Sequence, residues 1–180
     1  VENLSKSYGE KILFENINFA IDNGDKIGLV GVNGTGKSTF IKTIAGLVTP
    51  DYGSMIKARG LQIECLLQDA ELEPDNTVLM EVFKGNQPIM KVLAQYEQAL
   101  KVSETENNKL LQDEVLKLSQ EIDRLDGWKI ESDAKIVLTK LGITDFSQKI
   151  KNLSGGQKKR VALAASLINI CDLLILDEPT

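Results

Sequence analysis

Hydrophobic and polar residues alternate over the first part of the chain. The alternation covers residues 1–4 and 17–21, and the polar, glycine-containing residues 7–10 lie between these two runs. A period of two is typical of half-buried strands, and a short polar segment with glycine is typical of the turn that joins them. We therefore expect antiparallel strands within residues 1–23, which form a small β-layer.

Two other stretches are apolar without this alternation. Residues 26–30 end in a short apolar run, and residues 173–176 read Leu-Leu-Ile-Leu. Such runs are typical of strands buried in a parallel sheet. A turn cluster at residues 49–53 leads to another strand, and residues 60–67 predict a strand that ends at Gln68. The expected core is therefore α/β, with a mostly parallel sheet.

The hydrophobic spacing becomes helical between residues 88 and 126. Apolar residues recur there in steps of three and four, in two runs. The first run is Ile89, Leu93, Tyr96 and Leu100, and the second is Leu111, Val115, Leu118, Ile122 and Leu125. These narrow stripes predict two packed helices, each roughly 20 to 25 Å long, joined by a polar turn at residues 103–108. We expect an antiparallel hairpin that projects from the core; the alternative is that both helices lie flat on the domain.

Two more helices are expected near the end of the chain. Residues 134–141 have amphipathic spacing and stop at Gly142. The next helix follows Ser154-Gly155-Gly156-Gln157, and its apolar face holds Val161, Ala164, Ala165 and Ile168. Ser154 is well placed as the N-cap of this helix. The two glycines leave the helix start uncovered, which favours binding of an anion such as phosphate there.

Composition and charge narrow the classes of function. The chain has 180 residues, of which 42% are hydrophobic, and a formal net charge of −5. This acidic balance argues against the broad basic surface of a general nucleic-acid binder. Residues 88–126 carry five basic and eight acidic side chains, a net charge of −3, which favours protein contacts over phosphate contacts for the expected hairpin.

The cysteines, the apolar runs and the lack of histidine indicate the cellular compartment and the type of catalysis to expect. Cys65 and Cys171 lie in apolar surroundings, which indicates two reduced, buried thiols. Neither a membrane-spanning run nor a signal-peptide pattern occurs in the sequence, so we expect a cytoplasmic protein without direct membrane insertion. Histidine is absent, and catalysis would therefore rest on carboxylates and a metal ion.

Residues 31–38 read Gly-Val-Asn-Gly-Thr-Gly-Lys-Ser and fit the phosphate-loop pattern G-x-x-x-x-G-K-[ST] at every fixed position. They lie between the strand expected at residues 26–30 and a helical run at residues 39–45. The glycines let successive N–H groups turn inward, and this forms a concave site for triphosphate oxygens. The candidate nucleotide-binding residues are Gly31, Asn33, Gly34, Thr35, Gly36, Lys37, Ser38 and Thr39. Lys37 would reach the β/γ-phosphates and the Ser38 hydroxyl would bind Mg²⁺, whereas a glycine-rich turn without a ligand would explain neither residue.

Further candidates lie at strand ends. Carboxylates directly after a buried strand are costly unless they are paired, and a Mg²⁺ ion shared with the phosphates would pair Asp177. Glu178 could polarise a water towards the γ-phosphate. Tyr8 could stack on adenine or could pack as an ordinary turn aromatic. Gln68 could be a plain surface amide, but it ends a strand at the sheet edge where α/β folds bind ligands.

With these motifs together, the chain resembles an ATP-binding cassette ATPase along its whole length. The resemblance rests on the phosphate loop, on Leu153-Ser154-Gly155-Gly156-Gln157 and on residues 173–180. It implies a P-loop NTPase cassette that uses ATP and Mg²⁺. The roles it implies are adenine stacking for Tyr8, Q-loop ligand near Mg²⁺ for Gln68, Walker B acid for Asp177, catalytic base for Glu178, and signature motif for Ser154, Gly155, Gly156 and Gln157. It also implies that this signature closes over ATP held by the phosphate loop of a second nucleotide-binding domain.

The stretch between Gln68 and Ser154 is long for a transporter cassette, and it contains the expected hairpin and Asp126-Gly127-Trp128. It resembles the F subfamily of soluble tandem-cassette proteins that act on ribosomes, especially the Uup-like members. The D-loop and switch histidine of a complete cassette do not occur in this sequence. We therefore expect residues 1–180 to be a cassette truncated at its C-terminus and inactive alone, with residues 88–126 as a hairpin inserted in its helical subdomain.

Three functions are consistent with these motifs. The first is an ATP-hydrolysing cassette that acts on the ribosome in translation. The second is the ATP-binding subunit of a membrane transporter, which would receive its membrane partner near Gln68. A chromosome-maintenance or mismatch-repair cassette ranks third, because such proteins usually have a far longer insertion between the nucleotide motifs. A second phosphate loop further along the gene, after a charged helical linker, would favour the first function.

Overall fold

The computed structural model describes residues 1–68, 71–85, 87–105 and 108–179. The chain divides into two compact units. One comprises Val1–Cys65 with Cys171–Asp177, and the other comprises Leu66–Ile170 with Glu178–Thr180. The first unit contains most of the strands and the second is helical, so the chain as a whole is mixed α/β.

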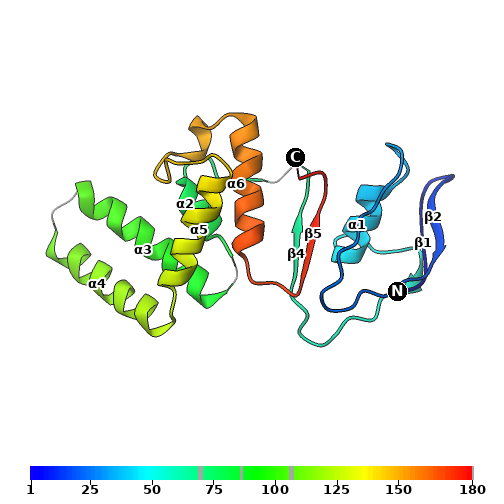
Figure 1. The fold of residues 1–180 in the computed structure, drawn as a ribbon, viewed down its shortest axis with the longest axis horizontal. Helices are drawn as coiled ribbons and strands as arrows, with labels where there is room; N and C mark the ends of the chain where they lie inside the picture. Colours follow the sequence, from blue (N-terminus) through cyan, green and yellow to red (C-terminus); the bar gives the residue numbers. More distant parts are fainter. Residues whose placement is uncertain (69–70, 86, 106–107, 180) are drawn as a thin grey trace. The chain divides into compact units, whose positions relative to one another are not determined.

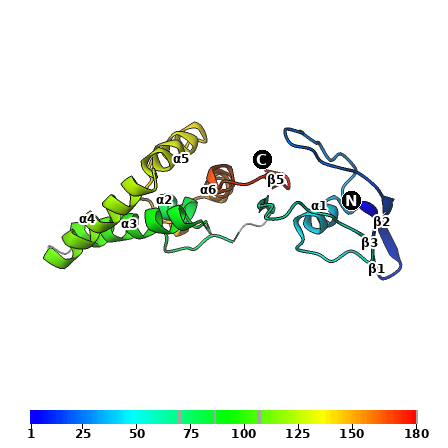
Figure 2. The ribbon, with the colours of Figure 1, turned by 90° about the horizontal axis from the view of Figure 1, so that it is seen from below.

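An antiparallel sheet with the strand order β2-β1-β3 lies in the first unit. Its strands are β1 (Glu2–Tyr8), β2 (Lys11–Ile17) and β3 (Tyr52–Ser54), all three labelled in Figure 2. The turn between β1 and β2 contains Gly9, whose φ of +58° lies in the left-handed region that glycine adopts readily. The antiparallel β-layer expected within residues 1–23 is therefore confirmed, and the strand after the turn cluster joins it. The second strand differs from the expectation, because it covers Lys11–Ile17, and residues 18–21 of the expected run form no strand.

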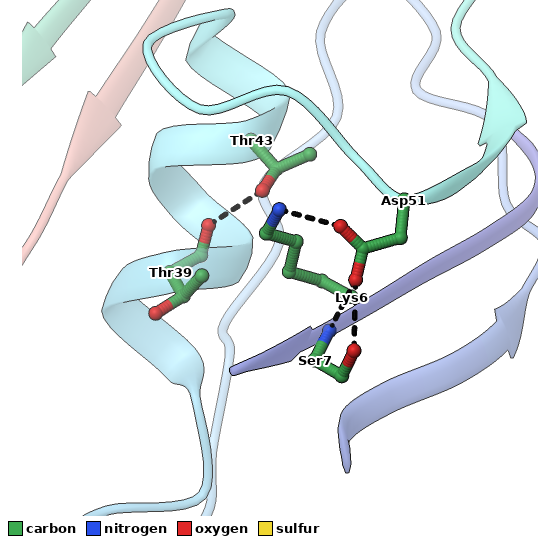
Figure 3. A network of polar contacts seen from close by, with 5 residues as sticks. All are labelled: Lys6, Ser7, Thr39, Thr43 and Asp51. Carbon is green, nitrogen blue, oxygen red and sulfur yellow. Dashed lines mark hydrogen bonds and ion pairs between the residues drawn. The ribbon is translucent and has the colours of Figure 1, made fainter. Parts of the chain in front are cut away.

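Asp51 ties the segment that precedes β3 to β1 (Figure 3). Its carboxylate accepts hydrogen bonds from Lys6 Nζ at 2.7 Å, from the Ser7 amide at 2.8 Å and from Ser7 Oγ at 2.9 Å. The hydrogen bond from Lys6, followed by those from Ser7, lowers the pKa of Asp51 to about 2. The network thus holds the end of β1, where Tyr8 lies, against the chain that leaves helix α1 (Lys37–Ala45).

Helix α1 packs on the antiparallel sheet through an aromatic cluster. The Phe40 ring lies 5.2 Å from the Phe14 ring in an edge-to-face arrangement and 5.6 Å from the Phe19 ring, measured between centroids. Thr43 is fully buried. Its hydroxyl donates a hydrogen bond to the Thr39 carbonyl at 2.8 Å, and Figure 3 draws this bond as a dashed line. These contacts fix the start of α1 beside β2.

A second sheet pairs β4 (Ile63–Leu66) with β5 (Leu173–Leu176). The amide of Asp172 donates to the Gln62 carbonyl at 2.9 Å, and the Gln62 amide donates to Asp172 Oδ2 at 2.8 Å. Since both residues directly precede their strands, β4 and β5 start side by side and run in parallel. The strands expected near residues 60–67 and 173–176 are thus confirmed, the first of them shorter than expected.

The strand expected at residues 26–30 is wrong. This segment has no strand in the structure, and Ile27 and Val30 expose 63% and 93% of their surface. A strand requires a hydrogen-bonded neighbour. In the described part of the chain, β4 and β5 pair with each other, and no strand pairs with residues 26–30.

The second unit consists mainly of helices (Figure 1), which pack around one hydrophobic core. Its elements are α2 (Val78–Val82), α3 (Pro88–Thr105), α4 (Lys109–Arg124), α5 (Trp128–Lys140), the 3-10 turn η1 (Ile150–Asn152) and α6 (Gly155–Ile168). The buried core residues are Val78, Leu79, Val82, Phe83, Met90, Leu93, Ile122, Ala134, Leu138, Ile143, Ile150, Leu153, Val161 and Ala164. None of the helices in the described part of the chain is both long and apolar enough to span a membrane.

Helices α3 and α4 lie side by side in both views (Figure 1 and Figure 2) and occupy the two runs with helical spacing. Leu93 and Ile122 of the predicted stripes are fully buried, whereas Leu111, Val115 and Leu118 are half-buried. Asn108 caps α4 by accepting a hydrogen bond from the Leu110 amide at 3.0 Å. The helical prediction is therefore confirmed; residues 106–107 of the expected turn lie outside the described residues.

The Asp126-Gly127-Trp128 sequence is a packed junction between α4 and α5. A Cβ atom added to Gly127 would lie 2.3 Å from Ile89 Cδ1 and 3.0 Å from Ile122 Cγ2. The Trp128 ring packs edge-to-face on Tyr96 at a centroid distance of 5.3 Å. Helix α5 begins at Trp128 rather than at residue 134, because Ile130 packs against the core and extends its apolar face by one turn.

Backbone hydrogen bonds connect residues 74–79 with residues 146–151. The amide of Ile150 donates to the Asn76 carbonyl and that of Lys151 donates to the Pro74 carbonyl, both at 3.0 Å. The carboxylate of Glu81, which is only 3% exposed, accepts from Asn76 Nδ2 at 2.7 Å. These hydrogen bonds therefore join residues 74–79, which come after Gln68 in the sequence, to residues 146–151, which lead to Ser154.

Candidate functional site

Two glycines shape the loop before α1. Gly34 and Gly36 have φ angles of +81° and +94°, which lie in the left-handed region that strains residues with a side chain. A Cβ atom on Gly36 would also lie 2.8 Å from the Cβ atom of Leu13 in β2. The loop therefore needs glycine at position 36 both for its backbone and for its contact with the sheet.

Side-chain donors hold the carbonyl groups of this loop. Lys37 Nζ donates to the Gly31 carbonyl at 2.7 Å and to the Val32 carbonyl at 3.1 Å. Thr35 Oγ1 also donates to the Val32 carbonyl, at 2.8 Å. Lys11 Nζ, which comes from β2, donates to the Gly34 carbonyl at 3.0 Å. Two ammonium groups thus lie at the loop, on its carbonyl oxygens.

The N–H groups of the loop differ from its carbonyl groups, because several of them have no hydrogen-bond partner in the described part of the chain. Within the described part of the chain, the N–H groups of Asn33, Gly34 and Gly36 donate no hydrogen bond. The first amides of α1, including those of Ser38 and Thr39, have no intrahelical acceptor either, as at any helix start. A loop with unpaired amides, a helix N-terminus and nearby ammonium groups suits an anion such as phosphate.

Ser38 and Asp177 meet although they are far apart in the sequence. Ser38 Oγ donates to Asp177 Oδ1 at 3.2 Å, and Asp177 is only 5% exposed. Hydroxyl and carboxylate oxygens are suitable Mg²⁺ ligands. In the described residues, no group of three or more His, Cys, Asp and Glu side chains could hold a metal. The donor set therefore fits an ion that takes its remaining ligands from phosphate or water.

Gln68 and Glu178 meet in the second unit. Gln68 Nε2 donates to Glu178 Oε2 at 3.5 Å, the outer limit of a hydrogen bond, and both side chains are exposed. Glu178 has a φ of +49°, which is uncommon for a residue with a side chain. Strained backbone of this kind is concentrated at functional sites.

Tyr8 ends β1 and is 57% exposed. Lys6 Nζ lies 5.7 Å from the centroid of its ring. The remaining exposed ring surface could contact a planar base through apolar contact. Tyr8 lies in the same unit as the phosphate loop, Ser38 and Asp177, whereas Gln68, Glu178 and the residues before α6 lie in the second unit.

Ser154 caps α6 through a reciprocal pair of hydrogen bonds. Ser154 Oγ accepts from the Gln157 amide at 3.3 Å, and Gln157 Oε1 accepts from the Ser154 amide at 2.9 Å. This capping box confirms Ser154 as the N-cap. Gly155 and Gly156 are exposed, and added Cβ atoms would meet no atom within 4 Å. The start of α6 is therefore stable and uncovered.

The sequence interpretation missed Lys11 and Leu13. Both lie in β2, and Lys11 pairs directly with Tyr8 across the hairpin. The alternating pattern around residues 7–10 contained this register, because two residues on either side of a tight turn face each other. The contact of β2 with the phosphate loop depends on tertiary structure and leaves no local signal.

The family model described as "ABC transporter" matches residues 14–180. An uncharacterized ABC transporter ATP-binding protein of Bacillus subtilis, YfmR, is 46% identical over 99% of this chain and 29% of its own length. The energy-dependent translational throttle protein EttA of Mycobacterium tuberculosis is 32% identical over 100% of this chain and 32% of its own length. ABC transporter F family member 5 of Arabidopsis thaliana is 33% identical over 100% of this chain and 27% of its own length.

The fold is shared with solved structures as well. In the complex of the archaeal ribosomal stalk protein aP1 with the ribosome recycling factor aABCE1, one chain matches with a TM-score of 0.57 and 27% identity. The match covers 98% of this chain and 26% of that chain. This chain thus has the mixed α/β fold of a P-loop cassette and spans about a third or less of the relatives named above.

Proposed function

This chain belongs to the ABC transporter family as an ATP-binding cassette, and we propose that it binds ATP at residues 31–39 and hydrolyses it. The observation that supports the proposal best is the 3.2 Å contact between Ser38 Oγ and Asp177 Oδ1. It brings a hydroxyl at the start of α1 together with a buried carboxylate at the end of β5. Such a pair beside a phosphate loop suits nucleotide and Mg²⁺ together.

The residues have distinct proposed roles. Lys37 exchanges its carbonyl contacts for phosphate oxygens, while the loop amides bind the same phosphates. Ser38, Asp177 and Gln68 are the proposed Mg²⁺ ligands, and the bound ion would neutralise phosphate charge. Glu178 accepts the proton of the attacking water. Tyr8 contacts the adenine ring.

The signature residues Ser154, Gly155, Gly156 and Gln157 form the proposed second phosphate-binding end. The exposed start of α6 supports this role, because its amides and helix dipole favour an anion. We assign its phosphate to ATP held by another cassette, in the same protein or in a dimer. A complete catalytic site then requires two nucleotide-binding domains, and residues 1–180 alone should not hydrolyse ATP.

For the whole protein we assign a role on the ribosome, as a cytoplasmic member of the F subfamily with Uup-like features. Relatives named as a translational throttle and as F family members support this role. The α3–α4 pair supports it too, because its net charge of −3 over residues 88–126 favours contact with protein surfaces. We regard residues 88–126 as an arm inserted into the helical subdomain.

The second candidate is the ATP-binding subunit of a transporter. The name of the Bacillus subtilis relative, an ABC transporter ATP-binding protein, supports it. In that case a separate membrane partner would contact the surface near Gln68. The two candidates share the nucleotide chemistry and differ in the partner.

Sedimentation of the complete protein with ribosomes separates them. Glu178→Gln, with the equivalent change in a second cassette if one is present, should trap the ATP-bound form, so it should sediment with ribosomes in ATP and less in ADP. A version in which a short glycine linker replaces residues 88–126 should sediment less. Equal sedimentation in ATP and ADP would contradict nucleotide gating. Recovery of the trapped protein only in membranes with an integral partner would replace the ribosome role by the transporter role.

A further inference from the structure

We propose that Lys11 is a positioning residue of the nucleotide site: its ammonium group holds the Gly34 carbonyl and thereby keeps the phosphate loop in the orientation that binds phosphate. The inference rests on the proposed ATP-binding function and adds a residue that lies outside the loop motif. Its basis is the 3.0 Å hydrogen bond from Lys11 Nζ to the Gly34 carbonyl.

The hairpin of β1 and β2 places Lys11 next to the phosphate loop. Lys11 is the first residue of β2 and pairs with Tyr8, the last residue of β1. A tight turn at Gly9 joins them, so the two side chains leave the same end of the hairpin. The proposed adenine contact and the Lys11 contact to the loop therefore depend on one rigid element.

The peptide group that follows Gly34 needs an outside contact to fix its orientation. Glycine adopts positive and negative φ with similar ease, so the peptide group between Gly34 and Thr35 has little intrinsic preference for one orientation. The peptide is trans, and its N–H therefore points away from its carbonyl. When Lys11 fixes the Gly34 carbonyl, it also directs the Thr35 amide to the side of the loop that faces away from the hairpin.

Two other contacts hold β2 against the phosphate loop and the start of α1. The Leu13 side chain packs where Gly36 lacks a Cβ atom, and the Phe14 ring packs edge-to-face on Phe40 of α1. Because these contacts already fix the strand, Lys11 loses less freedom when it binds the loop than a lysine on a mobile segment would. Together with Lys37, the Lys11 ammonium group places a second positive charge at the loop, which favours binding of a polyanion.

Substitution of Lys11 in the complete protein tests the inference. Lys11→Met keeps an unbranched apolar side chain of similar length and removes the donor and the charge, whereas Lys11→Arg keeps the donor and the charge. Lys26→Met is the matched control, since Lys26 is an exposed lysine of the same unit. The dissociation constants of a fluorescent ATP analogue and of adenosine, steady-state ATP hydrolysis and the melting temperature without nucleotide would be measured for each variant.

We expect Lys11→Met to raise the Kd and the KM for ATP by about 2- to 10-fold, the range of one net hydrogen bond, with kcat changed less than twofold. Adenosine affinity and the melting temperature without nucleotide should stay at the parent values, and Lys11→Arg should recover most of the ATP affinity. A purely structural role would lower the melting temperature and weaken adenosine binding as well.

Unchanged ATP affinity in Lys11→Met, or an equal loss in Lys26→Met, would overturn the inference. Failure of the proposed function has a different signature. In that case the parent protein would bind no ATP, or Lys37→Ala would bind it as well as the parent does.

Discussion

Gly127→Ala tests whether the junction between α4 and α5 sets the packing of α3. An added Cβ atom would lie 2.3 Å from Ile89 Cδ1 and 3.0 Å from Ile122 Cγ2, where ordinary contacts are at least 3.4 Å. The backbone at Gly127, with φ −79° and ψ −19°, accepts alanine without strain. The effect should therefore come from side-chain crowding alone.

The magnitude follows from the atoms that must move. Ile89 Cδ1 is the end of a flexible side chain, and turning it off its rotamer costs about 0.5–1.5 kcal/mol. Ile122 is fully buried and has little room to yield, so the whole change belongs in the overpacking range of about 1–3 kcal/mol. Ile89→Val removes the nearest clashing atom and alone should cost about 0.5–1.5 kcal/mol.

Native-state hydrogen exchange of the complete protein measures the local free energy of opening for α3, α4 and α5. We expect Gly127→Ala to lower it by about 1–3 kcal/mol, and the double variant with Ile89→Val to be less destabilised than the sum by about 1 kcal/mol. Gly155→Ala, at a helix start with open space, is the matched control and should have little effect. Additive effects in the double variant would refute the crowding argument.

Three further predictions concern the proposed nucleotide site and the first unit. Lys37→Ala should abolish ATP binding in the complete protein, whereas Glu178→Gln should retain binding and lose turnover, as binding and steady-state hydrolysis assays would report; turnover at the parent rate in Glu178→Gln would remove its role as base. Purified residues 1–180 should show negligible hydrolysis, and robust Glu178-dependent activity would contradict the composite site. Because the folded-state pKa of Asp51 is about 2 against an ordinary 3.8, its network should stabilise the fold above about pH 4 and lose this contribution as the pH falls towards 2; an NMR titration midpoint near 3.8 would contradict the network.

Local patterns in the sequence predicted the elements that depend on near neighbours. The apolar residues at steps of three and four over residues 88–126 lie where α3 and α4 pack on each other and on the core of the second unit. Ser154 caps its helix through Gln157, three residues away, so the cap is visible in the sequence. The paired acidic residues after β5 likewise pointed to Asp177, which the structure places next to Ser38.

The remaining features depend on which segments meet in space. Residues 26–30 have the composition of a buried strand, but pairing with a neighbour decides whether a strand forms. The Lys11 contact with Gly34 joins two segments that carry no joint pattern. The positive φ of Glu178 is also invisible in the sequence, since glutamate has no preference for this conformation. The roles of the site residues remain predictions for the experiments above.

The capping box of Ser154 has a consequence for proton placement. In the cap, Ser154 Oγ is an acceptor, because it receives the Gln157 amide. A hydroxyl has one hydrogen to give and two lone pairs, so the cap leaves its hydrogen available. An anion at the exposed start of α6 would meet a donor that the helix itself holds in place. Aspartate caps helices as well as serine does but has no such hydrogen when ionised, and Ser154→Asp would therefore keep the helix and repel the anion.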